Sequence, residues 1–219
     1  MVYRKELTYY FSTPVAYVVI GLYLLTISLF LWVIPGEWNI IESGYADVTG
    51  LFRLSPWLLL LLSSALTMRL FAEERESGTW DVLLSKGVSV SRIVSDKFFA
   101  AWTITLLALV PTVVHYFVVY TIAEPAGNVD GGAFAGSMAG LIMLSGTFTA
   151  IGLCCSSLTQ NQIVNFLLSA VVCFVLYWLV LQSRFESVAR GVIDLRDMVF
   201  FASVALVAVI LSIMINSRK

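Results

Sequence analysis

The sequence predicts an all-α integral membrane protein with six transmembrane helices, and three observations lead to this fold class. Hydrophobic residues make up 59% of the chain, charged residues only 12%, and the mean hydropathy is +0.91. Soluble domains carry about a quarter charged residues, so this chain could not cover a water-facing surface. Six apolar stretches approach the roughly 20 residues that a helix needs to cross a bilayer. Basic residues gather at the chain ends and in one long connection.

An amphipathic helix is expected ahead of the first span, over residues 2–13. Tyr3, Leu7 and Tyr10 share one helical face there, which is typical of a helix lying in the membrane interface. Pro14 provides the turn into the membrane. The expected spans, which together form a single transmembrane domain over 1–219, cover about residues 15–34, 52–71, 98–120, 134–157, 163–182 and 198–215.

The distribution of charge predicts that both ends of the chain are cytoplasmic. Connections 35–50 and 121–133 contain acidic residues and neither lysine nor arginine. The chain ends and the connection between the second and third spans are basic, through Arg4, Lys5, Arg69, Arg75, Lys86, Arg92, Lys97, Arg218 and Lys219. With six spans these basic parts fall on one side, which the positive-inside rule assigns to the cytoplasm.

One connection departs from this rule. Residues 182–197 should be external, yet they carry three arginines balanced by three acids: Arg184, Arg190, Arg196, Glu186, Asp194 and Asp197. Apolar residues recur there at three- and four-residue spacing, which predicts a short amphipathic helix at the outer membrane surface over about 184–196. A five-span alternative would put the C-terminus outside, in conflict with its terminal Arg-Lys pair.

The connection over residues 68–98 has the most definite local signals. Gly78 breaks the helix that continues from the second span, and Thr79 can cap a new helix. Gly87 suits the left-handed position that ends such a helix. These signals predict a short helix below the membrane, over about residues 79–86.

The apolar face of this short helix must be covered by something. It could pack on the chain's own helix ends or lie in the headgroups. It could instead dock into a separate cytoplasmic protein with Trp80 as the anchor, since tryptophan is enriched among interface hot spots. The candidate docking residues are Thr79, Trp80, Asp81, Val82, Leu83, Leu84 and Ser85. The neighbouring Glu73, Glu74 and Arg75 either flank this contact or form a solvated helix end.

Other polar residues also allow two interpretations. Gln160, Asn161, Gln162 and Asn165 open the fifth span, where they either line the inner mouth of a pathway or cap a helix at the headgroups. Small residues at four-residue spacing in the fourth span either pack within the bundle or form a subunit interface. His115 is the single histidine, and we expect it to pack or hydrogen-bond within the bundle.

Several functions are disfavoured. No GxxxxGKS/T phosphate loop occurs, so the chain cannot cradle a nucleotide by that mechanism. Cys154, Cys155 and Cys173 lie in apolar runs and match no zinc or disulfide spacing. No cluster of catalytic groups is visible, so we expect neither an enzyme nor a bound cofactor or metal. A net charge of -1 argues against a nucleic-acid partner.

The chain resembles the permeases of type-two (export-type) ABC transporters, most closely their gliding-motility branch. The resemblance spans essentially the whole chain and is carried by the runs KELTYYFSTPVAYVVIGLYLL, TMRLFAEERESGTWDVLL and GLCCSSLTQNQIVNF. It implies a multi-pass half-transporter in the bacterial cytoplasmic (inner) membrane. Residues 2–13 would be its elbow helix, and Thr79 to Ser85 its coupling helix, which inserts into a groove on a nucleotide-binding subunit.

The resemblance also implies a function. The chain would be the non-catalytic permease subunit of an ATP-driven exporter, and ATP and Mg²⁺ would bind to a partner ABC ATPase. A second permease half, identical or related, would complete the transporter among membrane lipids. The alternative is an ABC-type module that transmits the ATPase motion to a cell-envelope partner without transport.

Overall fold

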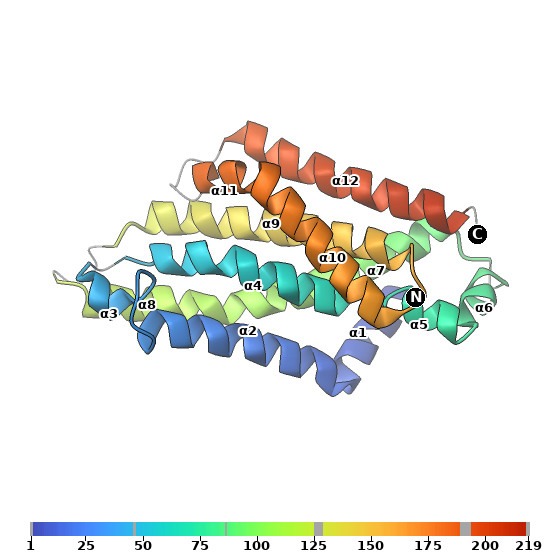
Figure 1. The fold of residues 1–219 in the computed structure, drawn as a ribbon, viewed down its shortest axis with the longest axis horizontal. Helices are drawn as coiled ribbons and strands as arrows, with labels where there is room; N and C mark the ends of the chain where they lie inside the picture. The colour runs from blue at the N-terminus through green and yellow to red at the C-terminus, as the bar shows by residue number, and fades with distance from the viewer. Residues whose placement is uncertain (1, 46, 86, 125–128, 189–193, 218–219) are drawn as a thin grey trace.

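The computed structural model describes residues 2–45, 47–85, 87–124, 129–188 and 194–217, and the described residues form a bundle of helices without a strand (Figure 1). Six helices are long and apolar enough to cross a membrane, as predicted. They are α2 (Pro14–Trp32), α4 (Thr49–Thr67), α7 (Val90–Leu109) with α8 (Val113–Ile122), α9 (Gly131–Ser156), α10 (Gln162–Leu176) with α11 (Gln182–Val188), and α12 (Leu195–Ser217). Four short helices connect or precede them: α1 (Val2–Ser12), α3 (Ile40–Ser43), α5 (Ala72–Glu76) and α6 (Thr79–Ser85).

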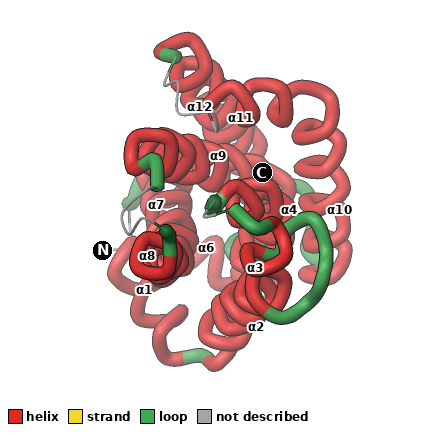
Figure 2. The backbone as a smooth tube through the Cα atoms, turned by 90° about the vertical axis from the view of Figure 1, so that its left-hand side faces the viewer, coloured by secondary structure: helices red, strands yellow, loops and turns green. Residues whose placement is uncertain are grey.

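Two of the spans form the centre of the bundle. In the apolar parts of α9 and α4, 72% and 67% of the residues are buried, against 17–33% in the other four spans. The view along the bundle shows α2, α7, α10 and α12 arranged around these two helices (Figure 2). The outer helices therefore present most of their apolar side chains to the surroundings, as expected of a protein in lipid.

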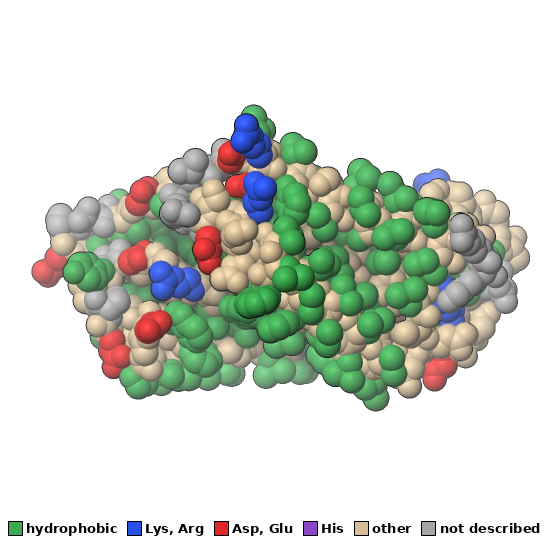
Figure 3. Space-filling view, turned by 45° about the horizontal axis from the view of Figure 1, so that its top comes forward, with side chains coloured by type: hydrophobic (Ala, Val, Ile, Leu, Met, Phe, Trp, Pro, Cys, Tyr) green, Lys and Arg blue, Asp and Glu red, His purple; other side chains and the backbone are tan. Residues whose placement is uncertain are grey.

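The two ends of the bundle differ in what they carry. The short helices α1, α5 and α6 lie together with the C-terminal end of α12, and we call this the α6 end (Figure 1). The opposite end, which holds α3, is the α3 end. Hydrophobic side chains cover the middle of the surface, and several acidic side chains gather at the α3 end (Figure 3).

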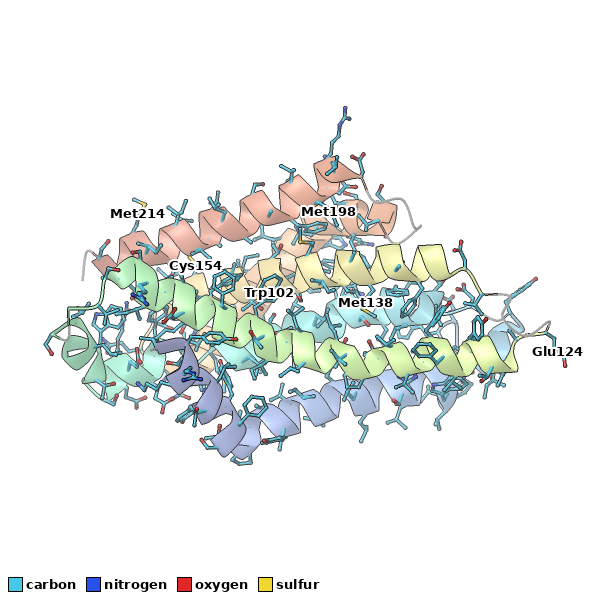
Figure 4. All side chains as sticks on the ribbon, turned by 180° about the vertical axis from the view of Figure 1, so that it is seen from behind. Trp102, Glu124, Met138, Cys154, Met198 and Met214 are labelled. Atoms are coloured by element: carbon cyan, nitrogen blue, oxygen red, sulfur yellow. The ribbon has the colours of Figure 1, made fainter. Side chains whose placement is uncertain are left out.

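Small residues of α9 allow its close contacts with neighbouring helices. A Cβ atom at Gly152 would overlap the Thr67 hydroxyl of α4, and one at Gly146 would lie 3.2 Å from the Trp102 ring of α7. Trp102 lies between α7 and α9 (Figure 4), and its Nε1 donates to Ser145 Oγ at 3.1 Å. These glycines therefore serve packing within the bundle.

The third span is longer than the sequence indicated and is interrupted once. Helix α7 begins at Val90, after Ser89 in an extended conformation, so Lys97 lies inside the helix. Pro111 lies in a 3-10 turn, Val110–Thr112, between α7 and α8, because proline cannot donate the next helical hydrogen bond. His115 follows in α8, and its Nδ1 accepts a hydrogen bond from Trp32 Nε1 at 3.0 Å, which confirms the expected structural role.

The structure differs from the prediction of a separate outer helix over 184–196. The fifth span passes through a π-helical turn, Tyr177–Leu181, and continues as α11 to Val188. Phe185 and Val188 are buried against Gly140 of α9, so their apolar spacing serves the bundle and not the membrane surface. Arg184 Nη1 pairs with Asp197 Oδ1 at 3.0 Å, which joins α11 to the start of α12. Residues 189–193, including Arg190, lie outside the described residues.

Candidate functional site

The short helix α6 has the boundaries that its glycines predicted. Gly78 has φ +69° and Gly87 has φ +72°, a left-handed conformation that glycine adopts without strain. The helix begins at Thr79, whose hydroxyl bonds the Ser77 hydroxyl at 2.9 Å and donates to the Glu74 carbonyl at 3.4 Å. It ends at Ser85, and Lys86 lies outside the described residues.

Trp80 does not have the position that an anchor for a partner protein requires. Its side chain is only 6% exposed, and its ring packs edge-to-face on Phe71 with centroids 5.6 Å apart. The chain itself covers this indole because Phe71 offers an apolar surface directly beneath α6. Leu83 and Leu84 are half-buried against the same core, whereas Thr79 and Ser85 are exposed. Asp81 and Val82 belong to the same helix.

The segment that carries α6 is bonded to other helices of the bundle. We call residues 68–76, the turn after α4 together with α5, the junction. The Phe71 N–H donates to Ser156 Oγ of α9 at 3.1 Å. Asn165 of α10 donates through Nδ2 to the Met68 carbonyl. These bonds satisfy backbone groups that the break between α4 and α5 frees from helical pairing.

Arg75 connects the junction to α9 and α12. Its Nη1 donates to the Ser157 carbonyl and its Nη2 to Asn216 Oδ1, both at 2.6 Å. Asn216 Nδ2 donates to Ser157 Oγ at 2.8 Å, and Ser157 Oγ lies 2.7 Å from Ser212 Oγ. A planar guanidinium that bonds two helices at once holds their relative position better than a flexible ammonium could.

Glu74 connects the junction to α1 and α7 through a buried lysine. Lys97 is 1% exposed, and its Nζ lies 3.0 Å from Glu74 Oε2 and 2.8 Å from Glu6 Oε1. The same ammonium donates to the Leu70 carbonyl at 2.6 Å. A buried charge is tolerated only where opposite charges and hydrogen bonds surround it, and this lysine has two hydrogen bonds and two carboxylates beside it.

Glu73 also bonds to α1, from the exposed side of the junction. Its Oε1 accepts a hydrogen bond from the Tyr9 hydroxyl at 3.0 Å. Burial, and secondarily this bond to Glu73, raises the pKa of the Tyr9 phenol. Burial also raises the pKa of Tyr10, whose hydroxyl donates to the Leu66 carbonyl at 2.6 Å. Both tyrosines therefore stay neutral at physiological pH.

The four polar residues at the start of the fifth span do not act as one group. Asn161 caps α10, because its Oδ1 accepts from the N–H groups of Ile163 and Val164. Asn165 is buried and binds the junction, whereas Gln160 is exposed and Gln162 half-buried. The capping interpretation thus describes Asn161, and Asn165 has a third role, which the sequence did not indicate.

Glu6, Arg69 and Lys97 are the site residues that the sequence analysis missed. Arg69 and Lys97 counted there only as positive charges of a cytoplasmic connection. A signal for Lys97 was present: it lies at helical spacing from Ile93, Val94 and Ala101, all fully buried, so one face of α7 includes it. No pattern in the sequence identifies Glu6 as its partner.

A comparison with protein-family models decides the family. Residues 54–189, more than half of the chain, match the model of the ABC-2 family transporter protein. The chain belongs to the ABC-2 transporter family. No curated protein sequence matches it. The matched region of this ABC-2 permease runs from within α4 to the end of α11 and includes the junction and α6.

Family membership carries two functional statements. The protein is a multi-pass membrane permease subunit of an ABC transporter, that is, a membrane transport component. Membership also implies association with an ABC ATPase subunit.

Proposed function

We propose that this ABC-2 permease couples ATP hydrolysis on a partner ABC ATPase to substrate export, with α6 as the coupling helix and α1 as the elbow helix. ATP and Mg²⁺ would bind to the partner. The observation that carries the proposal is the attachment of α6 to the junction, which is itself bonded to α1, α7, α9, α10 and α12. A displacement of α6 by the partner would therefore reach five helices at once.

The docking surface would be the outward side of α6. Thr79 and Ser85 are exposed on this helix, and Trp80 and Leu83 face the chain's own core. In this arrangement Trp80 transmits force between α6 and Phe71 and does not enter the partner. Glu74 and Arg75 would act in the same way, as internal connections behind the docking surface.

The α6 end would face the cytoplasm of a bacterial inner membrane. Described basic residues concentrate at this end, namely Arg4, Lys5, Arg69, Arg75, Arg92 and Lys97. The positive-inside rule assigns such an end to the cytoplasm, where an ATPase finds ATP. A second permease half, identical or related, would pack against part of the apolar surface of the outer helices.

Affinity purification from the native membrane in mild detergent tests the proposal. We expect mass spectrometry to find an ABC ATPase bound to the tagged wild-type chain. Ser85→Arg should lose this ATPase, because a long charged side chain would stand on the exposed side of α6. Ser183→Arg is the matched control, since Ser183 is also exposed but lies at the α3 end. Equal retention of the ATPase by both variants would argue against docking through α6.

The alternative of force transmission to an envelope partner shares the docking step. It differs in what else co-purifies: an envelope protein would be retained by the wild type and lost on changes at the α3 end. We also propose that this permease is most like the gliding-motility branch of the type-two ABC permeases.

A further inference from the structure

Arg69 is a buried cation without a counter-charge. It is 7% exposed, and among the described residues no carboxylate lies within ion-pair distance of its guanidinium. Its Nη2 is buried and has no hydrogen-bond partner in the part of the chain that the structure describes. Buried charges in proteins are normally paired, because removing an ion from water is costly. The Arg69 guanidinium has a side-chain hydrogen bond with Tyr10, but its Nη2 group lacks an acceptor among the described residues.

Two tyrosine rings account for the position of Arg69 but not for its unpaired donors. The guanidinium carbon lies 3.8 Å from the centroid of the Tyr9 ring and 4.5 Å from that of Tyr10. Such cation–π contacts favour the charge and hold the guanidinium plane in place. They cannot accept its in-plane N–H groups, which call for oxygen acceptors.

The cavity beside Arg69 has room for such an acceptor. It measures about 210 Å³ and lies between α1, the junction and the start of α6. Its lining comprises Lys5, Glu6, Tyr9, Arg69, Leu70, Glu73, Glu74, Ser77, Thr79 and Lys97. The Lys5 side chain is 58% exposed, and its ion pair with Glu74 Oε1, at 3.5 Å, is long. An exposed ion pair of this kind contributes little, so the Lys5 ammonium can turn toward a ligand. Lys97, in contrast, is already held by Glu6 and Glu74.

The charges around the cavity favour a ligand that carries both a negative and a positive group. Three basic residues, Lys5, Arg69 and Lys97, stand against the three acidic residues in the lining, so the cavity has no net charge. A multiply charged free anion would meet Glu73, whose carboxylate is half-buried and accepts a hydrogen bond from the Tyr9 hydroxyl. A zwitterion with a phosphate and an amine fits both kinds of group. Its phosphate would bind Arg69 and Lys5, and its ammonium would bind Glu73.

We propose that this cavity binds the phosphoethanolamine headgroup of a membrane phospholipid. The phosphate group of the headgroup would bind Arg69. The lipid would come from the leaflet at the α6 end, along which the amphipathic helix α1 would lie. Because Ser77 and Thr79 also line the cavity, the bound headgroup contacts the first residue of α6. The lipid thus joins α1 to the helix proposed to receive the ATPase, although its binding does not depend on that role.

Thermal unfolding of the delipidated full chain in detergent tests this site. Phosphatidylethanolamine should raise the unfolding temperature of the wild type, since a ligand stabilises the state that it binds. Arg69→Gln should bind the lipid about tenfold more weakly, as expected for the loss of a charge-assisted contact. Without lipid, Arg69→Gln should unfold at the wild-type temperature or above it, because it removes an unpaired buried charge. Arg92→Gln, an exposed arginine outside the cavity, is the control and should behave as the wild type.

Three outcomes would overturn the proposal. The first is equal stabilisation of the wild type and Arg69→Gln by phosphatidylethanolamine. The second is stabilisation by inorganic phosphate with none by the lipid, which would assign the site to a free anion. The third is an Arg69→Gln protein that is much less stable than the wild type without lipid, because Arg69 would then be paired within the chain. Native mass spectrometry of the same samples gives the number of bound lipids independently of stability.

Discussion

At the scale of single residues, the α6 end depends on one lysine that lies between two carboxylates. Lys97 pairs with Glu6 from α1 and with Glu74 from α5, and it also donates a hydrogen bond to the Leu70 carbonyl. The centroid of the Phe71 ring lies 5.3 Å from the same ammonium, and Trp80 packs on this ring as well. The buried ion cluster and the attachment of α6 are therefore neighbouring parts of one structure.

Removing this lysine should destabilise the protein strongly. Lys97→Met leaves Glu6 and Glu74 close together without their counter-ion, and breaking such a buried cluster costs about 3–5 kcal/mol. The measurement is the unfolding free energy or apparent Tm of the purified chain in detergent. Lys5→Met is the matched control, because its ion pair with Glu74 is largely exposed and should contribute about 1 kcal/mol or less. Similar losses in the two variants would show that Lys97 is not paired in the interior.

The burial of Lys97 could be predicted from the sequence, but its ion-pair partner could not. The apolar face of α7 contained Lys97 at the correct spacing, so its burial could have been foreseen. Its partner Glu6 is 91 residues away in the chain, and no periodicity links the two. Trp80 illustrates the opposite error, because an apolar residue on a short helix can face the chain's own core as readily as a partner.

At the scale of elements, α6 is fixed by its ends, by the contact of Trp80 with Phe71 and by the packing of Leu83 and Leu84 on the core. Glycines in a left-handed conformation stand at either end. Gly78 was predicted as a helix break and Gly87 as the left-handed end of the helix. The direction in which the helix faces could not be predicted, since it depends on Phe71 and the junction. The described part of the outer helix expected over 184–196 differs for a related reason: Phe185 and Val188 pack on α9, which local spacing does not reveal.

Trp80→Ala should release α6 from the bundle without unfolding the spans. The substitution removes the edge-to-face contact with Phe71, which is made by the most deeply buried apolar side chain of α6, and leaves the half-buried Leu83 and Leu84 to hold the helix. We expect limited proteolysis to cut between residues 78 and 89 at least several-fold faster, with unchanged helix content by circular dichroism. Glu76→Ala, at an exposed position shortly before α6, should leave the rate of cleavage unchanged. An unchanged rate in Trp80→Ala would mean that Phe71 does not hold the helix.

At the scale of the whole molecule, two central helices are surrounded by four that face lipid. The number of spans followed from composition, because few other structures satisfy long apolar stretches in a membrane. The arrangement of the other spans around α4 and α9 could not be predicted from composition, although the small residues of α9 indicated that it packs closely against other helices. The hydrogen bonds that join five helices to the junction are a property of this arrangement and of no single segment.

The central claim is that a partner ATPase docks on α6 and moves the junction. Its most direct test is a photo-crosslinking amino acid placed at Ser85 of the full chain in its native membrane, with the same probe at Glu42 as the control. Both positions are exposed, and they lie at opposite ends of the bundle. We expect illumination to link the ABC ATPase to the chain from position 85 and not from position 42. An ATPase captured at both positions, or at neither while the complex remains assembled, would contradict docking through α6.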